Sequence, residues 1–334
     1  MTLRGWNSFQ YGSTGWSLGS FNRTNGTGQS GYASLRATLG AYTAAVYGYT
    51  AMTEVIHGWC YKRNAAPADD RIFHLYQSGT QRVRILAGSA GEIIVSTGTG
   101  NGTEVGRTAT GVINASVETY IEVRCKHSAT VGEIEVHVNG NPTAALSLTG
   151  LNTGTASEQV ELAGGGGGTR DISAWYFIEV DATAPNDFLG HIRFGCLDAM
   201  TPSGANNDFV GSDGNSTDNY LLVDDGFTPD DDTTYVQSAT VGATDTYTMG
   251  NLPTPALSVI AVCPIIRAKK TDAGTRALTA VIRSGGTDYD GAVEQFLSTS
   301  YSGYREAFLQ NPDGPVDWDE TSVNAIEVGM KVST

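Results

Sequence analysis

Apolar and polar residues alternate along short segments of this chain, and helical periodicity is almost absent. In residues 121–126, Ile, Val and Cys alternate with Glu, Arg and Lys, and residues 133–138 repeat the pattern. This alternation places apolar side chains on one face of a strand and charged side chains on the other, so both segments predict half-buried strands of an antiparallel sheet. Residues 175–180 are apolar at almost every position, which predicts a central strand covered on both faces.

Strand-like runs recur along the whole chain, with Gly, Asn, Thr and Ser between them. Before residue 200 the clearest runs are 54–62, 71–76, 82–87, 92–96, 119–127, 133–139 and 174–181, and after residue 228 they are 233–236, 246–249, 256–263, 276–283 and 325–332. Short strands with such turns predict an all-β protein of two β-sandwich (jelly-roll) domains. One short helix is expected after Trp318, with Asp319 and Glu320 in its first turn and with Val323 and Ile326 pointing inward.

The distribution of charge divides the chain in two. Residues 1–200 carry 13 basic and 16 acidic side chains, residues 201–334 carry 7 and 19, and no Lys or Arg occurs from 194 to 266. Residues 201–219 are rich in Gly, Ser, Asn and Asp, which predicts a connection between domains. The expected organisation is an aromatic N-terminal segment at 1–20, a jelly roll at 21–200, an acidic linker at 201–228 and a β-sandwich module at 229–334.

The composition and net charge of the chain exclude two classes of binding partner, nucleic acids and anionic membranes. The chain has 334 residues, 40% of them hydrophobic, and a net charge of −15, so it can form cores but would be repelled by phosphate backbones and anionic lipid. No nucleic-acid binding or membrane insertion is therefore expected. The first residues lack the apolar core of a signal peptide, and the four widely spaced cysteines predict reduced, buried thiols.

Candidate catalytic residues are few. Alternation puts Glu133, Glu135 and His137 on one strand face, and paired carboxylates are what glycoside hydrolysis requires. The neighbouring strand offers Glu122, Arg124 and Lys126 as cross-strand partners, so we favour a solvated sheet face with ion pairs, no catalytic residue and no enzyme activity. The five glycines at 164–168 lack the Lys of a phosphate-binding loop and predict a tight crossing between strands.

Two groups of residues are candidates for binding. The first is aromatic, and a protein interface is favoured over sugar stacking for its members Trp6, Phe9, Tyr11 and Trp16. The second is rich in oxygen ligands and is a weak calcium candidate, formed by Asp213, Asn215 and Asp218. It lacks the twelve-residue loop of an EF-hand, so a solvated linker without metal is favoured and no cofactor is expected.

Two stretches resemble known families. Residues 118–124, 133–140 and 171–180, with the glycine-rich stretch before the last, follow the order of strands in a laminin-G or concanavalin A-like jelly roll. This resemblance covers about 20–198 and implies a fold while saying little about a ligand.

The second resemblance is to a module of virion structural proteins of tailed bacteriophages. It is carried by residues 231–236, 270–276, 283–291, 298–301, 310–312 and 323–329, together with Trp318. The resemblance implies a non-enzymatic, minor tail-type structural protein that is made in the bacterial host cytoplasm and located in the virion.

As part of a tail, a fibre or a head-surface decoration, such a protein would contact other virion proteins as a homo-oligomer and act in virion assembly and host attachment. An alternative is a carbohydrate-binding adhesin that recognises host surface polysaccharide. A lesser alternative is a glycan-degrading enzyme that uses Glu133 and Glu135.

Overall fold

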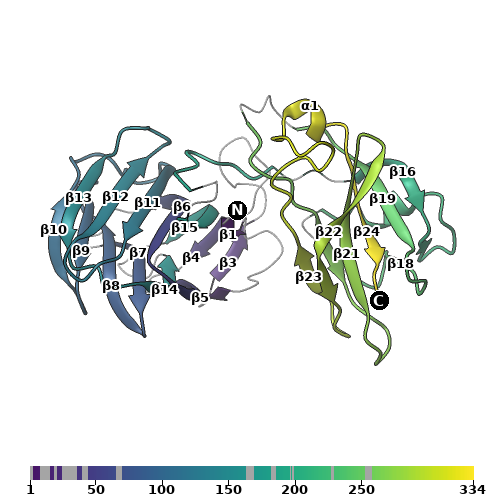
Figure 1. Cartoon of the computed structure of the whole chain (residues 1–334), viewed down its shortest axis with the longest axis horizontal. Coiled ribbons are helices and arrows are strands. Elements are labelled where there is room, and N and C mark those ends of the chain that lie inside the picture. Colours follow the sequence, from purple (N-terminus) through teal and green to yellow (C-terminus); the bar gives the residue numbers. More distant parts are fainter. Residues whose placement is uncertain are drawn as a thin grey trace. The chain divides into compact units, whose positions relative to one another are not determined.

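The chain forms two compact all-β units, which a computed structural model describes at residues 3–7, 16–18, 21–24, 36–39, 44–64, 70–162, 169–181, 186–195, 197, 199–226, 229–252 and 258–334. The first unit spans Met1–Phe194 and the second spans Gly195–Thr334. Strands make up nearly all of the regular structure in both units, as the alternating pattern predicts (Figure 1).

Fifteen strands of the first unit form two antiparallel sheets. They are β1 Leu3–Asn7, β2 Trp16–Leu18, β3 Phe21–Thr24, β4 Arg36–Leu39, β5 Ala45–Met52, β6 Glu54–Arg63, β7 Asp70–Gln77, β8 Thr80–Ala87, β9 Ile93–Thr97, β10 Thr103–Arg107, β11 Thr119–Lys126, β12 Gly132–Val138, β13 Leu146–Leu151, β14 Ser157–Leu162 and β15 Arg170–Glu179. Sheet A has the order β13-β12-β11-β6-β15-β4-β3, with β1 also paired to β15, and sheet B has the order β10-β9-β8-β7-β14-β5-β2. The sheets therefore place strands that are distant in sequence side by side.

The main core lies between the two sheets. Alternate residues of β6, β11, β12 and β15 meet alternate residues of β7, β8, β9 and β14 there, with Trp59 stacked on Phe73 at 5.0 Å between ring centroids. Fully buried His57 lies among the rings of this core, 4.6 Å from Phe177, and neither of its nitrogens has a hydrogen-bond partner. Desolvation lowers the pKa of His57 to about 3, so this histidine is neutral in the folded chain.

The outer face of sheet A is covered by residues 186–194. An apolar cluster of Ile56, Cys60, Tyr120, Ala174, Tyr176 and Ile178 packs there against Phe188, Leu189, Ile192 and Phe194. Buried Glu122 holds the segment in place because it accepts hydrogen bonds from the Gly190 amide at 2.9 Å and from the Tyr176 hydroxyl at 2.5 Å. Strand β15 is thus buried on both faces, as predicted for residues 175–180.

Replacement of Tyr176 by Phe is expected to loosen this covering segment. The hydroxyl of Tyr176 donates to Glu122 and accepts from the Leu189 amide at 3.2 Å, and its loss leaves buried polar groups with fewer partners. Unfilled buried hydrogen bonds of this kind cost about 1–3 kcal/mol of unfolding free energy. Hydrogen exchange of the Leu189 and Gly190 amides should accelerate, and unchanged exchange at both would contradict the assigned role.

The second unit is built on a five-stranded antiparallel sheet. Its elements are β16 Ala199–Asn207, β17 Val210–Gly211, η1 Asn219–Leu222, β18 Val236–Gln237, β19 Thr244–Met249, β20 Ile265–Ala268, β21 Ala277–Ser284, β22 Thr287–Phe296, β23 Ser302–Arg305, α1 Glu320–Val323 and β24 Glu327–Val332. The main sheet has the order β16-β19-β24-β21-β22, and β17-β18 and β20-β23 are separate two-stranded ribbons. Asp319 caps α1, and Val323 and Ile326 are buried, so the predicted helix is confirmed.

The stretch 201–228 was expected to be a linker, but its described residues 201–226 belong to the folded second unit. Most of β16, together with β17 and η1, lies here, and β16 pairs with β19. Fully buried Asn219 donates from Nδ2 to the Phe209 carbonyl at 3.1 Å and to Asp245 Oδ2 at 2.7 Å. Polar side chains therefore order this stretch by forming hydrogen bonds with buried groups. Because the stretch contains few apolar residues, the sequence pattern does not show that it is folded.

The expected strand at 256–263 is also not found where the structure describes it. Residues 253–257 lie outside the described residues, and Val259 and Val262 make isolated bridges to Trp318 and Phe308. Both valines still pack on the core cluster that contains Trp318. The apolar pattern thus correctly predicts that Val259 and Val262 pack on a core, but it wrongly predicts that they form a continuous strand.

Candidate functional site

A row of polar side chains crosses the outer face of sheet B. Strand register pairs Glu161 of β14 with His74 of β7, His74 with Arg84 of β8, and Arg84 with Ser96 of β9. These residues alternate with the inward Val160, Leu75, Val83 and Val95 of the core, so their side chains point away from it. Together with Arg71, Tyr76 and Gln159 we call this row the polar face.

Hydrogen bonds connect the centre of the polar face. The Tyr76 hydroxyl donates to Glu161 Oε2 at 2.8 Å, and His74 Nδ1 lies 3.5 Å from Glu161 Oε1. Burial opposes ionisation of Glu161, but the contacts with His74 and Tyr76 outweigh it and lower the pKa of that carboxyl. Burial and the Glu161 charge raise the pKa of Tyr76. The centre therefore carries one carboxylate and one neutral phenol near neutral pH.

The hairpin loop between β9 and β10 borders this face. Arg84 Nη1 donates to the backbone oxygen of Asn101 at 2.9 Å and contacts its side-chain oxygen at 3.2 Å. His74 and Arg84 form the floor of the face, since they are 2% and 6% exposed, whereas Tyr76 and Gln159 are half-buried and Arg71 is exposed. A ligand would meet the last three side chains first.

Several groups of the polar face have no partner. Among the arginines whose side chains the structure describes, only Arg71 and Arg82 form neither a hydrogen bond nor an ion pair, and of these Arg71 lies on the polar face. Gln159 also lacks a partner for its amide, and buried His74 Nε2 is unpaired. Free donors and acceptors on a sheet face are suited to bind a polar ligand.

The candidate carboxylates of β12 lie on the other sheet. Glu133 is 3.5 Å from Lys126 Nζ across the β11–β12 pair, and Glu135 Oε1 is 2.9 Å from His137 Nε2. Arg124, the other expected partner, contacts Glu54 of β6 instead, at 2.6 Å. The predicted solvated face of ion pairs is thus present only in part: Lys126 contacts Glu133 as expected, but Arg124 has another partner, and Glu122 and His137 are buried. Both candidate glutamates are held by neighbours on their own sheet.

The aromatic interface candidates are only partly within the described residues. Trp6 lies in β1 opposite Tyr176 of β15, and Trp16 lies in β2 opposite Tyr47 of β5. Phe9 and Tyr11 lie outside the described residues. Both tryptophans are thus on strands that extend the sheets of the first unit, and their role in an interface stays a prediction.

The calcium candidates form local turns. The Asp213 carboxylate accepts hydrogen bonds from the backbone and side-chain amides of Asn215, at 3.2 and 2.7 Å, and Asn215 accepts from the Thr217 amide at 2.7 Å. Asp218 precedes η1 without capping it. Within the described ranges no three His, Cys, Asp or Glu side chains gather in a way that could hold a metal, so calcium here stays a prediction.

Three of the four cysteines can be placed. Cys60, Cys125 and Cys263 are free thiols, as predicted; the first two are buried as expected, whereas Cys263 is half-buried. Cys196 and the glycines at 164–168 lie outside the described residues. The helices that the structure describes, η1 and α1, have four residues each, and neither can span a bilayer.

No protein-family model matches the chain. No curated protein matches its sequence either. Among solved structures, the chain is similar to the carbohydrate recognition domain of Emp46p in its potassium-bound form, with 9% identity, 52% of this chain and 99% of that chain covered, and a TM-score of 0.34.

Two further similar structures match about the same share of this chain. Winged bean basic lectin with Tn-antigen shows 11% identity over 52% of this chain and 95% of the lectin, with a TM-score of 0.35. A Trypanosoma rangeli sialidase mutant with trans-sialidase activity shows 10% identity over 51% of this chain and 28% of the sialidase, with a TM-score of 0.36. The two-sheet architecture of the first unit is established by its own strand pairing.

Alternation along the chain predicts that His74 and Arg84 lie within strands, but it does not reveal the polar face. A signal is present in the alternation of 71–76, where His74 and Tyr76 share one strand face. Their partners Glu161 and Gln159 come from β14, a strand more than 80 residues later that the pattern did not identify. Pairing between distant strands, which local alternation does not encode, assembles the face.

Proposed function

We propose that the first unit is a non-enzymatic binding module that recognises a carbohydrate on the polar face of sheet B. The observation that carries this proposal is that two accessible polar side chains on that face, Arg71 and Gln159, form no hydrogen bond or ion pair within the chain. Sugars present many hydroxyl groups that can both donate and accept, and such groups match planar amide and guanidinium side chains.

The outer face of sheet A is less suited to a ligand. Residues 186–194 cover much of it through the apolar cluster around Tyr120 and Tyr176. On the remainder, three contacts between neighbouring side chains engage most of the charged groups: Arg124 with Glu54, Lys126 with Glu133 and His137 with Glu135. On sheet B, by contrast, Tyr76 adds a half-buried aromatic ring beside the free amide of Gln159, its cross-strand neighbour. An aromatic ring beside hydrogen-bonding groups is a common way to hold a sugar.

Arg71→Ala and Gln159→Ala are each expected to weaken glycan binding by roughly tenfold, the loss typical of about one hydrogen bond to a ligand. Neither side chain forms a hydrogen bond or an ion pair within the chain, and the charge of Arg71 acts on Glu161 and Tyr76 only without direct contact, so the fold should not change. The measurement is a screen of the full chain on a glycan array, followed by titration of the best ligand with each variant.

Lys126→Ala on the outer face of sheet A is the matched control, because Lys126 is about half exposed and far from the polar face in the strand order. It should bind as the unaltered chain does. Absence of binding to every glycan, or equal losses in all three variants, would overturn the proposal.

The second candidate function is that of a structural component of a tailed-phage particle, located in the virion and in contact with other virion proteins as a homo-oligomer. It rests on the resemblance of residues 229–334 alone, and it is compatible with glycan binding because host attachment uses surface polysaccharide. Location of the protein in a density map of intact particles tests it, and particles that lack the protein would exclude it.

A further inference from the structure

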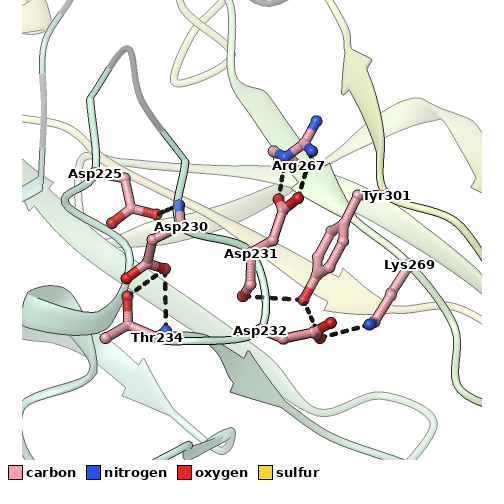
Figure 2. Close-up of polar contacts among 8 residues, drawn as sticks. All are labelled: Asp225, Asp230, Asp231, Asp232, Thr234, Arg267, Lys269 and Tyr301. Carbon is pink, nitrogen blue, oxygen red and sulfur yellow. Dashed lines mark hydrogen bonds and ion pairs between the residues drawn. The ribbon is translucent and has the colours of Figure 1, made fainter.

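The acidic run of the second unit lies against a cluster of basic and aromatic side chains. Figure 2 shows Asp231 facing Arg267, with two contacts at 2.6 and 2.9 Å, and Asp232 facing Lys269 at 2.5 Å. Arg267 and Lys269 belong to β20, and Tyr301 directly precedes β23, the other strand of the same ribbon. We call residues 230–234 the acidic strap, and Arg267, Lys269 and Tyr301 the cationic face.

Tyr301 completes the cationic face. Its hydroxyl lies 3.1 Å from the Asp231 carbonyl oxygen, to which it donates, and 3.2 Å from Asp232 Oδ1 (Figure 2). Lys269 Nζ lies 4.5 Å from the centre of the Tyr301 ring and the Arg267 guanidinium lies 5.3 Å from it. The face thus offers two cations and a hydroxyl donor, the groups that bind carboxylates and backbone carbonyls.

We propose that the cationic face is an interaction surface for acidic peptide segments and that the acidic strap occupies it in cis. Charge complementarity supports this occupant. Residues 201–334 hold only seven basic side chains against nineteen acidic ones, yet two of the seven, Arg267 and Lys269, lie on the cationic face. Arg267 and Lys269 therefore provide the positive charge that an acidic segment requires.

The docked strap is held weakly enough to exchange with such a segment. Its contacts are ion pairs at the surface: the side chains of Asp232 and Asp231 are 71% and 39% exposed, and those of their partners Lys269 and Arg267 are 24% and 36% exposed. Exposed ion pairs contribute little individually and are screened by salt. Asp231 also has a φ of 56°, a left-handed conformation that side-chain-bearing residues rarely adopt.

The strap is otherwise organised by its own residues. Asp230 accepts hydrogen bonds from the Thr234 amide at 3.0 Å and from its hydroxyl at 2.8 Å, and the Asp225 carboxylate accepts from the Asp230 amide at 3.2 Å (Figure 2). These local bonds do not involve the cationic face. The strap can therefore leave the face without losing its own turn, and the main sheet of the second unit need not unfold.

The first test is exchange of the strap in the full chain. The double variant Asp231→Asn with Asp232→Asn should accelerate hydrogen exchange of the amides at 231–234 by roughly tenfold, because it removes both ion pairs. The amides of β19 should exchange at the same rate as before. High salt should have the same effect on the unaltered chain, and exchange that depends on neither salt nor the variant would overturn the proposal.

The second test is binding of an acidic peptide in trans. A synthetic peptide with the sequence of residues 229–236 is titrated into the unaltered chain and into the double variant, at low salt and with nuclear magnetic resonance detection. The peptide should bind the variant roughly tenfold more tightly, because the face is then open.

Two controls make this result specific. The same peptide with Asn at both positions should not bind, and Arg267→Gln added to the double variant should abolish binding of the acidic peptide. Equal binding to the closed and open chains, no binding to the open chain, or equal binding of the Asn peptide would each overturn the proposal.

Discussion

Asp70→Asn is expected to lower the free energy of unfolding of the first unit by about 3–5 kcal/mol, the usual cost of breaking a buried ion pair from one side. Asp70 and its partner Arg170 are each 1% exposed, and they join β7 of sheet B to β15 of sheet A. The Tyr61 hydroxyl also donates to Asp70, at 2.5 Å. The variant leaves the Arg170 charge buried without its carboxylate.

Calorimetry or denaturant unfolding of the full chain measures this effect. Glu133→Gln is the matched control, because it breaks an ion pair at the surface: Glu133 and its partner Lys126 are both about half exposed. This variant should change the free energy of unfolding by less than about 1 kcal/mol. The double variant Asp70→Leu with Arg170→Met should be more stable than Asp70→Asn, because it removes both members of the buried pair, while nearby Arg63 keeps its hydrogen bonds to the Gly88 and Ile113 carbonyls. A double variant less stable than Asp70→Asn would contradict this account of the pair.

His57 should make the first unit less stable as the pH falls. Its pKa of about 3 in the fold lies below the usual 6.5, so below pH 6.5 the unfolded chain takes up a proton that the folded chain does not. The free energy of unfolding is therefore unaffected by His57 above pH 6.5, and it decreases as the pH falls from 6.5 toward 3. At pH 5 the loss is about 2 kcal/mol.

His57→Phe isolates this contribution. The phenyl ring occupies a similar space between Phe73 and Phe177 and leaves no unpaired nitrogen in the core, so the variant should be at least as stable near pH 7.5. The difference in unfolding free energy between the variant and the unaltered chain should grow by about 2 kcal/mol from pH 7.5 to pH 5. His127, whose pKa is also lowered by burial, is present in both proteins and cancels. If the difference in unfolding free energy does not change with pH, burial does not lower the pKa of His57 and this account is wrong.

Much of the fold could be predicted because local alternation reports which residues are buried. The expected strands at 54–62 and 119–127 correspond to β6 Glu54–Arg63 and β11 Thr119–Lys126, and the turn at Asn139–Gly140 has the positive φ values, 56° and 70°, that such a pair favours. The short helix was found from its capping residues. These features depend on neighbours within a few residues.

The linker and the polar face could not be predicted, since both depend on contacts between distant segments. Asn219 is buried because Asp245, a residue of β19, accepts its hydrogen bond, and nothing local marks an Asn as buried. His74 reaches Glu161 only because β14 pairs with β7, although the two residues are 87 positions apart in the sequence. The order of strands in a sheet is not contained in the alternation along any one of them.

The amino-acid sequence by itself determined that this protein is all-β, that it divides into two units of unequal charge, and that its cysteines are free thiols at the three described positions. Only the tertiary structure decided where polar groups gather. It buried Asp70 against Arg170, placed Arg71 and Gln159 on the polar face of sheet B, and docked the acidic strap on Arg267 and Lys269. The physical reason is that burial follows from the local period of apolar residues, whereas partners for charge follow from strand pairing over long distances in sequence.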